Sequence, residues 1–363
     1  MIDHNALLPL LRNVKDPMTG RDIIESKMVH DLKVKGNNVH FTLKLLNPDA
    51  PYKSNLIFDC MGQIKSKFPD AEVDIHVEAS RTNADVQSPL PHVKNFIAVA
   101  SGKGGVGKST AAVNLAVALK QQGFNVGIID ADLYGPSLPT MLGLQGERPQ
   151  IKDMYGVQTM IPLDYKGIPV MSLGFVIQPE QAVVLRGPKL SGILKQFISQ
   201  CHWPELDYMV IDLPPGTGDI HLTLVQTLPL TGAVMVTTPQ QVAVVDAVKA
   251  ANMFLIDNIK VPVLGIIENM AWFTPEELPD NKYFLFGKGG GEKLSQLVKA
   301  PVIGQVPIMM SVREGGDSGE PVAWDTESKA GKIWKNLAIE LDKAVQQRNA
   351  NLDPTNIVKI TTY

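Results

Sequence analysis

The segment 102–110, GKGGVGKST, places glycines, lysines and a serine at a spacing that suits phosphate chemistry. The fixed positions of a G-x-x-x-x-G-K-S/T pattern are filled by Gly102, Gly107, Lys108 and Ser109. Glycines let successive backbone N–H groups turn toward phosphate oxygens, a lysine ammonium offsets charge on the β and γ oxygens, and a hydroxyl can bind Mg²⁺. The segment therefore predicts a loop that holds ATP and Mg²⁺. We expect contacts to the nucleotide from Gly102, Lys103, Gly104, Gly105, Val106, Gly107, Lys108, Ser109 and Thr110.

Acidic residues follow two further apolar runs. Asp130 and Asp132 leave the run 126–129 two residues apart, and alternation along an extended chain points their side chains the same way. An Asp-x-Asp pair can instead cap the turn after a strand, and that alternative stays open. Asp212 ends the run 208–211, where a carboxylate can accept hydrogen bonds from Mg²⁺-bound water.

The residues after Asp212 read LPPGTGD. Gly216 lets a backbone N–H meet the γ-phosphate and move when that phosphate leaves, while the two prolines before it restrict the swing. This segment predicts a switch loop.

The elements that position these groups alternate in kind from residue 94 onward. Apolar runs of strand length alternate with longer helical patterns, such as 111–119, which follows the glycine-rich segment. The expected strands are 96–100, 126–129, 208–211, 232–236, 263–267 and 302–306. We therefore predict an α/β fold of the P-loop NTPase class, with a mostly parallel sheet covered by helices on both faces. Ligands of such sheets collect at the carboxyl ends of the strands, where every group named above falls.

A small α+β domain is predicted in front of this sheet. Its expected elements are a helix at 7–14, strands at 28–35 and 39–46, a helix at 53–68 and a strand at 72–77. Residues 81–93 are polar with two prolines, which is typical of a linker. The predicted organisation is a domain at 1–80, a linker at 81–93 and an ATPase domain at 94–363.

The composition narrows the choice of partners and location. A net charge of −3 gives no general attraction to nucleic acid or anionic lipid, and no apolar run approaches the length of a membrane span. The N-terminal residues lack the basic character of a signal peptide, so we expect a cytoplasmic protein that binds neither membrane nor nucleic acid. Cys60 and Cys201 lack metal-site spacing and fit buried thiols better than ligands.

Lys103, at the second position of the loop, separates this sequence from ordinary phosphate loops. The form GKGGxGK[ST] resembles the deviant Walker A ATPases, which include MinD, ParA and the nitrogenase iron protein. Further strings make the resemblance specific to the Mrp/ApbC family of iron–sulfur cluster carriers over about residues 94–347: DADLYGPS, RGP, DLPPGTGD, TTPQQVAVVDAVKA, ENM, FGKGGGEKL and VREGGDSGEP. Residues 1–80 resemble the small iron–sulfur assembly domain often fused to such ATPases.

The resemblance implies a role for each polar residue of the site. Lys103 would reach across a homodimer to the partner's ATP, and Asp132 would orient or deprotonate the attacking water. The implied catalytic set is Lys103, Lys108 and Asp132. Mg²⁺ would be held by Ser109, Asp130 and Asp212, through the hydroxyl or through water. Asn269, at the end of a strand, would pair with adenine, although it also suits a simple turn, and Pro239 and Gln240 lie at another strand end.

The sequence departs from the family at the cluster site. A C-x-x-C motif that usually follows ENM is missing from residues 270–286, and the cysteine usual in the N-terminal domain is replaced by Ala50. Ligands of an iron–sulfur cluster are therefore not identified, although the resemblance still implies a cluster as cargo. Trp272, Phe273 and Tyr283 occupy the region instead and suit an apolar dimer contact or a docking surface for clients.

These features support an ATP-hydrolysing carrier or assembly factor that dimerises around nucleotide and delivers iron–sulfur clusters to apoproteins. Its implied partners are apoprotein clients and iron–sulfur assembly proteins. The main alternative is a metal-free scaffold or positioning ATPase, switched by nucleotide like MinD and ParA. An inactive remnant is disfavoured by the intact Lys108, Ser109, Asp130, Asp132 and Asp212.

Overall fold

The computed structural model describes residues 2, 4–17, 20–45, 52–79, 88–132, 135, 137–154, 157–176 and 187–358. Contacts divide the chain into two compact units, Met1–Asp85 with Ile151–Met160, and Val86–Gln150 with Ile161–Tyr363. Several residues considered above lie outside the described part of the chain: Ala50, residues 81–87 of the predicted linker, Leu133, Tyr134, Pro136 and Arg186.

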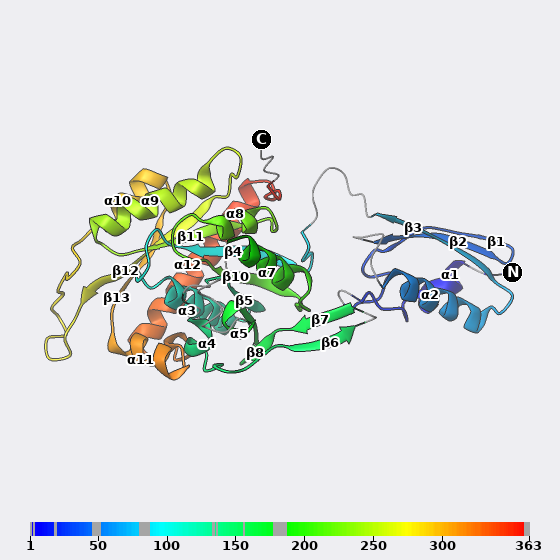
Figure 1. Cartoon of the computed structure of the whole chain (residues 1–363), viewed down its shortest axis with the longest axis horizontal. Helices are drawn as coiled ribbons and strands as arrows, with labels where there is room; N and C mark the ends of the chain where they lie inside the picture. Colours follow the sequence, from blue (N-terminus) through cyan, green and yellow to red (C-terminus); the bar gives the residue numbers. More distant parts are fainter. Residues whose placement is uncertain are drawn as a thin grey trace. The chain divides into compact units, whose positions relative to one another are not determined.

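The first unit is a three-stranded sheet with two helices (Figure 1). Its elements are α1 (His4–Leu11), β1 (Val29–Lys35), β2 (Asn38–Leu45), α2 (Lys53–Lys67) and β3 (Glu72–Ala79). Strands β1 and β2 pair antiparallel, and β3 joins β2 in parallel. Alternate residues of β2, including Phe41 and Leu43, are completely buried in the core of this unit. The predicted order of helix, hairpin, helix and strand is thus present.

A short hairpin, β6 (Gln150–Met154) and β7 (Val157–Ile161), forms a separate two-stranded sheet. Its residues 151–160 group with the first unit, although they lie far from it in the sequence. No pattern in the sequence predicts this hairpin.

The second unit is built on an eight-stranded sheet of order β13-β12-β11-β4-β10-β5-β9-β8. All neighbours pair in parallel except β8 and β9, which are antiparallel. The strands are β4 (Val93–Ala100), β5 (Val126–Asp130), β8 (Leu163–Tyr165), β9 (Ile168–Ser172), β10 (Leu206–Asp212), β11 (Gly232–Thr237), β12 (Val263–Phe273) and β13 (Val302–Ile308). All six predicted runs are strands of this sheet, which confirms the predicted fold class.

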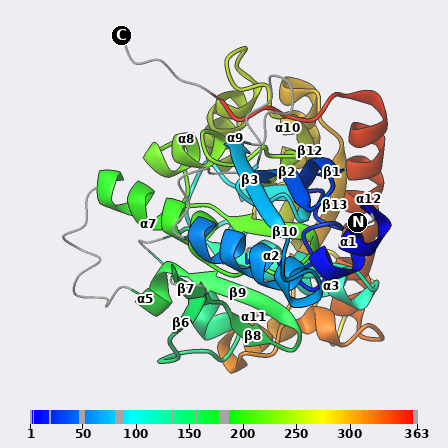
Figure 2. The same ribbon diagram turned by 90° about the vertical axis from the view of Figure 1, so that its right-hand side faces the viewer.

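Helices cover both faces of the sheet (Figure 1, Figure 2). One group contains α3 (Lys108–Gln121), α4 (Leu138–Met141), α5 (Leu173–Val176), α11 (Met310–Ser318) and α12 (Lys329–Asn351). The other contains α7 (Gly187–Ser199), α8 (Asp219–Val225), α9 (Gln241–Leu255) and α10 (Gly290–Val298). Because β4 and β10 are buried on both faces, their sequences are continuous apolar runs rather than alternating ones.

The helices were also compared with the length and hydropathy that a membrane span requires. Within the described residues, none of them is long and apolar enough to span a bilayer.

Candidate nucleotide site at the carboxyl edge of the sheet

The glycine-rich loop connects β4 to α3, as its sequence predicts. Gly105 and Gly107 have φ angles of +80° and +86°, which side chains other than glycine rarely adopt. Gly102 is required for a different reason, because a Cβ there would overlap the backbone of Asp246 in α9. The loop therefore needs glycine both for its turns and for its close packing against a neighbouring helix.

Lys108 is the centre of a buried cluster at this loop. Its Nζ lies 2.7 Å from Asp212 Oδ1, 3.3 Å from Asp132 Oδ2 and 3.2 Å from Ser109 Oγ. Only 6% of the Lys108 side chain is exposed, so these interactions lie in a low-dielectric environment. Four of the predicted site residues, taken from three separate segments, thus meet around one ammonium group.

Asp130, beside this cluster, is oriented by Ser172, a residue without a signal in the sequence. Its Oδ2 accepts a hydrogen bond from Ser172 Oγ at 2.8 Å, and its Oδ1 accepts one from the backbone N–H of Asp132 at 3.0 Å. Burial, followed by the negative charge of Asp212 directly across the sheet, raises the pKa of Asp130 to about 8. Ser172 ends β9, a strand with no predicted counterpart, so its proximity to Asp130 had no signal in the sequence.

Two carboxylate oxygens remain available in this cluster. Asp132 Oδ1 and Asp212 Oδ2 are buried and have no hydrogen-bond partner among the described residues. Burial raises the pKa of Asp212, while the charge of Lys108 opposes that rise. Oxygen acceptors of this kind suit a hydrated Mg²⁺, which takes few protein ligands and keeps several waters. Within the same described residues, no three His, Cys, Asp or Glu side chains form a metal-binding group by themselves.

The predicted switch loop is anchored to the end of β4. The N–H of Gly216 donates to the carbonyl oxygen of Ser101 at 2.9 Å, and Gly216 has a φ angle of +91°. This contact places the loop beside the phosphate loop, and the left-handed conformation explains why glycine is needed there.

Asn269 is turned toward the phosphate loop. Its Nδ2 donates to the carbonyl oxygen of Val106 at 2.9 Å, and a Cβ on Gly107 would overlap that amide. The side chain therefore braces the loop from within β12, which continues to Phe273, so the prediction that Asn269 ends its strand is wrong. The predicted contact between Asn269 and adenine stays a prediction.

Glu268, the residue before Asn269, contacts the glycine-rich segment FGKGGGEKL that begins at Phe286. Its carboxylate is buried and accepts hydrogen bonds from Gln305 Nε2 at 2.9 Å and from the N–H of Gly291. A carboxylate at the N-terminus of α10 satisfies an unpaired N–H and complements the helix dipole. Gly290 must be glycine because a Cβ there would overlap Pro239. This glycine-rich segment is therefore a packing element and not a second phosphate loop.

Lys103 differs from Lys108 in its surroundings. Its side chain is exposed, and within the described part of the chain it has no recorded ion pair or hydrogen bond. It borders a cavity of about 140 Å³ lined by Lys103, Gly104, Gly105, Val106, Thr238, Gln240, Met270 and Phe286. The loop thus presents one cation to its own buried carboxylates and a second one outward.

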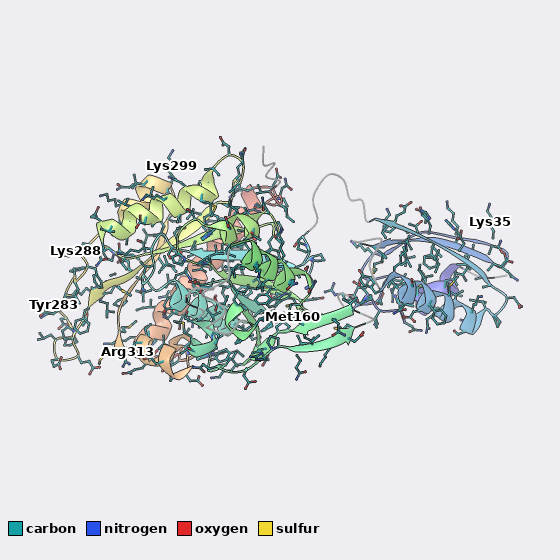
Figure 3. All side chains as sticks on the ribbon, viewed as in Figure 1. Lys35, Met160, Tyr283, Lys288, Lys299 and Arg313 are labelled. Carbon is teal, nitrogen blue, oxygen red and sulfur yellow. The ribbon has the colours of Figure 1, made fainter. Side chains whose placement is uncertain are left out.

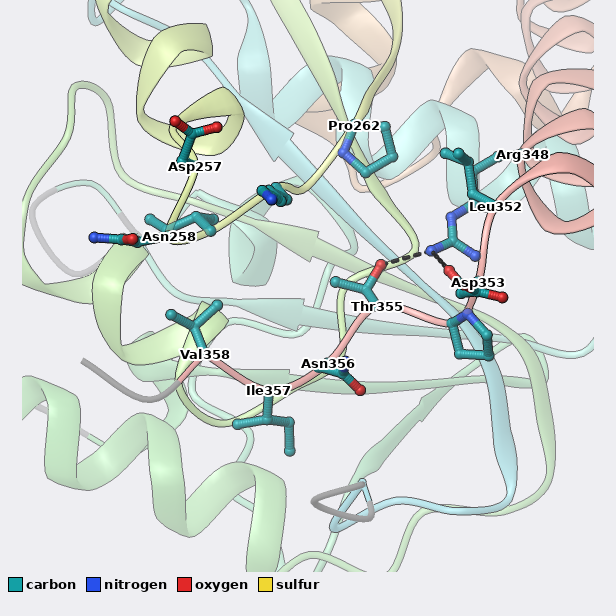
Figure 4. Close-up of a pocket in the computed structure, with 13 residues that line it drawn as sticks. Asp257, Asn258, Pro262, Arg348, Leu352, Asp353, Thr355, Asn356, Ile357 and Val358 are labelled. Atoms are coloured by element: carbon teal, nitrogen blue, oxygen red, sulfur yellow. Dashed lines mark hydrogen bonds between the residues drawn. The ribbon is translucent and has the colours of Figure 1, made fainter. Parts of the chain in front are cut away.

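A second, larger cavity of about 420 Å³ lies at the opposite edge of the sheet (Figure 4). It is lined by Asp257–Lys260, Pro262, Arg348 and Leu352–Val358, close to the start of β12. Arg348 Nη2 donates to Asp353 O and Thr355 Oγ1, both at 2.7 Å. None of the predicted nucleotide contacts lies in this cavity.

Neither cysteine has the character of an exposed thiolate ligand. Cys60 in α2 and Cys201 ahead of β10 are buried, and burial raises the pKa of each thiol to about 12. Both thiols are therefore protonated at neutral pH in the absence of a metal. Cys201 also precedes the amino end of β10, which begins at Leu206.

The region where a C-x-x-C motif is missing forms a hairpin. Phe273 and Tyr283 exchange backbone hydrogen bonds of 2.9 and 2.8 Å. Lys282 Nζ lies 4.2 Å from the centre of the Trp272 ring, and Leu285 is 62% exposed. Figure 3 shows Tyr283 at the periphery of the second unit. Residues 272–286 thus combine exposed aromatic and aliphatic side chains with charged ones, and Phe286 lines the same cavity as the phosphate loop.

Comparison with known families accounts for both units. The family described as "NUBPL iron-transfer P-loop NTPase" matches residues 92–342. The family described as "Iron-sulfur cluster assembly protein" matches residues 5–77. The predicted resemblance is confirmed for both parts.

Individual relatives agree with this assignment. An iron–sulfur cluster carrier protein of Synechocystis is 46% identical over 346 residues, covering 94% of this chain and 97% of its own. A carrier protein of the same name from Escherichia coli K12 is 49% identical over 253 residues, covering 69% and 67%.

Solved structures support the fold. A nucleotide-binding protein of Archaeoglobus fulgidus in complex with ADP is 38% identical with a TM-score of 0.55, covering 64% of this chain and 88% of its own. The cell division ATPase MinD of Pyrococcus furiosus has a TM-score of 0.51 at 23% identity, covering 69% and 98%, and shares the fold. From these matches and from the site at the end of β4, we conclude that the chain belongs to the iron–sulfur cluster carrier proteins of the NUBPL iron-transfer P-loop NTPase family.

Proposed function

We propose that this carrier binds and hydrolyses ATP as a Mg²⁺-dependent homodimer in the cytoplasm and delivers iron–sulfur clusters to apoproteins. The observation that carries the proposal is the separation of two cations on one loop. Lys108 is buried against Asp212 and Asp132, whereas Lys103 is exposed without a recorded partner in the described structure. One lysine serves the nucleotide of its own subunit, and the other is available to the nucleotide of a second copy.

The chemistry assigned to the site is in-line attack of water on the γ-phosphate. Lys108 offsets charge on the β and γ oxygens, and Asp132 orients the water and accepts its proton. The buried Oδ1 of Asp132, which has no partner among the described residues, is the acceptor for that proton. Ser109 would hold a Mg²⁺ ion through its hydroxyl, and Asp130 and Asp212 would hold it through water; when bound, the ion would supply further charge neutralisation. Ser172 fixes the orientation of Asp130.

The partner subunit completes the site with its own Lys103. A cation that arrives only when two subunits meet links hydrolysis to dimerisation, because the transition state of phosphoryl transfer is then stabilised only in the dimer. No DNA, RNA or membrane contact is part of this proposal. The proteins that bind the dimer are apoprotein clients and iron–sulfur assembly proteins, which the name of the matching N-terminal family supports.

The cluster is the cargo of the reaction, and its ligands are not assigned. The names of the relatives support the carrier role. One observation favours the alternative of a metal-free, nucleotide-switched scaffold: residues 270–286, where the C-x-x-C motif is missing, contain neither cysteine nor histidine, and both cysteines of the chain are buried elsewhere. Anaerobic reconstitution with iron and sulfide, followed by transfer to an apoprotein, separates the two functions.

The dimeric mechanism is tested by mixing two defective variants. Lys103→Ala lacks the cation given to the partner, and Asp132→Asn lacks the proton acceptor of its own site. A heterodimer of the two contains one complete site, formed by Asp132 of the first variant and Lys103 of the second. We expect each variant alone to be nearly inactive and the mixture to regain ATPase activity. A mixture no more active than its components would refute the transfer of Lys103 between subunits.

A further inference from the structure

His221 is a buried histidine directly behind the switch loop. It lies in the first turn of α8, three residues after Gly218, and its side chain is 0% exposed. Its backbone N–H donates to the carbonyl oxygen of Gly218 at 3.0 Å. Neither ring nitrogen makes a hydrogen bond of good geometry with the described residues, although the Gly218 carbonyl is close enough to interact with the ring. The described conformation therefore leaves the donor and the acceptor of the ring incompletely used.

Helix α9 links the imidazole ring of His221 to the phosphate loop, because α9 contacts both of them. The ring centre of Phe254 in α9 lies 6.3 Å away. The same helix packs its backbone at Asp246 against Gly102 of the phosphate loop. Burial lowers the pKa of His221 to about 4, the nearby Gly218 carbonyl opposes this shift, and the positive charge of Lys108 adds to it. The imidazole is therefore neutral and lies within electrostatic reach of both Gly218 and Lys108.

A neutral imidazole with unmade hydrogen bonds is unfavourable in a protein interior, and leucine would fill similar space without that cost. The cost of such a buried polar group is offset if the group makes hydrogen bonds in a second conformation of the protein. The adjacent loop is able to move, since Gly216 and Gly218 flank Thr217 and lack the steric limits of other residues. Pro214 and Pro215 restrict the motion to the part of the loop nearest His221.

We propose that His221 is a positioning residue for the switch loop, whose ring hydrogen-bonds the loop backbone at Gly218 when bound triphosphate draws residues 216–218 toward the γ-phosphate. The inference rests on the proposed function, because it requires a nucleotide in the phosphate loop. The imidazole does not touch the substrate. It holds the loop from behind, so that the N–H groups of the loop stay aimed at the phosphate.

The test compares three variants of the full-length chain with wild type. His221→Leu keeps the volume and removes the polar atoms, and His221→Gln restores a donor and an acceptor. Phe254→Leu is the matched control, because it alters packing around the same ring without changing any hydrogen bond. For each protein we would measure kcat, KM for ATP and the melting temperature. Hydrogen exchange at residues 216–219 would be followed with and without Mg²⁺ and a non-hydrolysable ATP analogue.

We expect His221→Leu to lower kcat about tenfold, the effect of one lost hydrogen bond in the transition state, with KM changed less than about twofold. Its melting temperature should equal or exceed that of wild type. The analogue should slow exchange at residues 216–219 in wild type and His221→Gln but not in His221→Leu. Phe254→Leu should lose stability and keep its kcat.

Two results would overturn the proposal. One is wild-type kcat and wild-type protection in His221→Leu. The other is a glutamine variant as defective as the leucine variant, accompanied by an equally defective Phe254→Leu, which would show that only packing matters. If wild type itself fails to hydrolyse ATP, the proposed function fails, and the exchange measurement with the bound analogue still decides the role of His221.

Discussion

The side-chain amide of Asn269 donates a hydrogen bond to the carbonyl oxygen of Val106 over 2.9 Å. This contact joins β12 to the phosphate loop, and the two residues are 163 positions apart in the sequence. The loop is therefore held from outside as well as by its own glycines, and the amide fills the space that a side chain at Gly107 would need.

Replacement of Asn269 separates this bracing contact from the predicted contact with adenine. A lost brace should weaken ATP and GTP binding equally, by about 5–10-fold for one hydrogen bond, because both nucleotides share the phosphates. A lost base contact should weaken ATP alone. Measured dissociation constants of Asn269→Ala for both nucleotides check this. We expect the equal loss, and selective loss of ATP would show that Asn269 pairs with the base.

Removal of the Ser172 hydroxyl should affect Asp130 specifically. Ser172→Ala leaves one oxygen of a buried carboxyl group without its donor, and the expected loss of unfolding free energy is about 1–3 kcal/mol. The concentration of Mg²⁺ needed for half-maximal ATPase activity should rise as well, since Asp130 is no longer held in place. Ser172→Thr keeps the hydroxyl and serves as the control. Identical Mg²⁺ dependence in Ser172→Ala and wild type would contradict the role assigned to Ser172.

Alanine substitutions of Lys108 and Lys103 should have different effects on ATP binding, dimerisation and kcat. Lys108→Ala removes the charge that meets the phosphates and leaves buried Asp212 and Asp132 without a counter-ion, so ATP binding should be abolished. Lys103→Ala should retain binding, measured by calorimetry, and should lower kcat and ATP-dependent dimerisation, measured by phosphate release and sedimentation. Unchanged turnover in Lys103→Ala would show that the exposed lysine has no catalytic part.

The two cysteines should react slowly in the folded protein. Their thiol pKa values of about 12 leave little thiolate at about pH 8, and alkylation by iodoacetamide should proceed only after unfolding. Cys60→Ala and Cys201→Ala should also retain as much iron as wild type after anaerobic reconstitution. Loss of bound iron in either variant, with the fold intact by circular dichroism, would identify that thiol as a ligand.

His221 should make the stability of the fold depend on pH. Its pKa falls from 6.5 to about 4 on folding, so between these values the unfolded chain binds a proton that the folded chain does not. The unfolding free energy therefore decreases as the pH falls through this window. Melting curves at about pH 7 and about pH 4.5 should show a larger loss in wild type than in His221→Leu. Equal losses would indicate that His221 does not titrate in this range.

The sequence was informative where chemistry depends on neighbours along the chain. The phosphate loop, Asp132 and Asp212 were predicted because each sits at a fixed distance from an apolar run, and the structure brings all of them to Lys108. The six strands were found for the same reason, because strands buried on both faces leave continuous apolar runs.

Contacts between distant segments could not be predicted in this way. Ser172 binds Asp130 across 42 residues, and Glu268 binds Gly291 across 23, and neither pair has a local signal. Gly290 and Gly291 leave room for Pro239 and for the Glu268 side chain, respectively, and these contacts have no local signal either. Residues 151–160 group with the first unit although they are distant from it in the sequence, and no local pattern predicts this grouping.

The backbone pair between Phe273 and Tyr283 has a practical consequence. It closes the loop 274–282 at its base, whereas Glu268 and Asn269 are fixed before the loop begins. The sequence of loop 274–282 can therefore change without altering the contacts that Glu268 and Asn269 make. A C-x-x-C sequence placed between Phe273 and Tyr283 would add two thiols to this loop and leave the contacts of Glu268 and Asn269 unchanged.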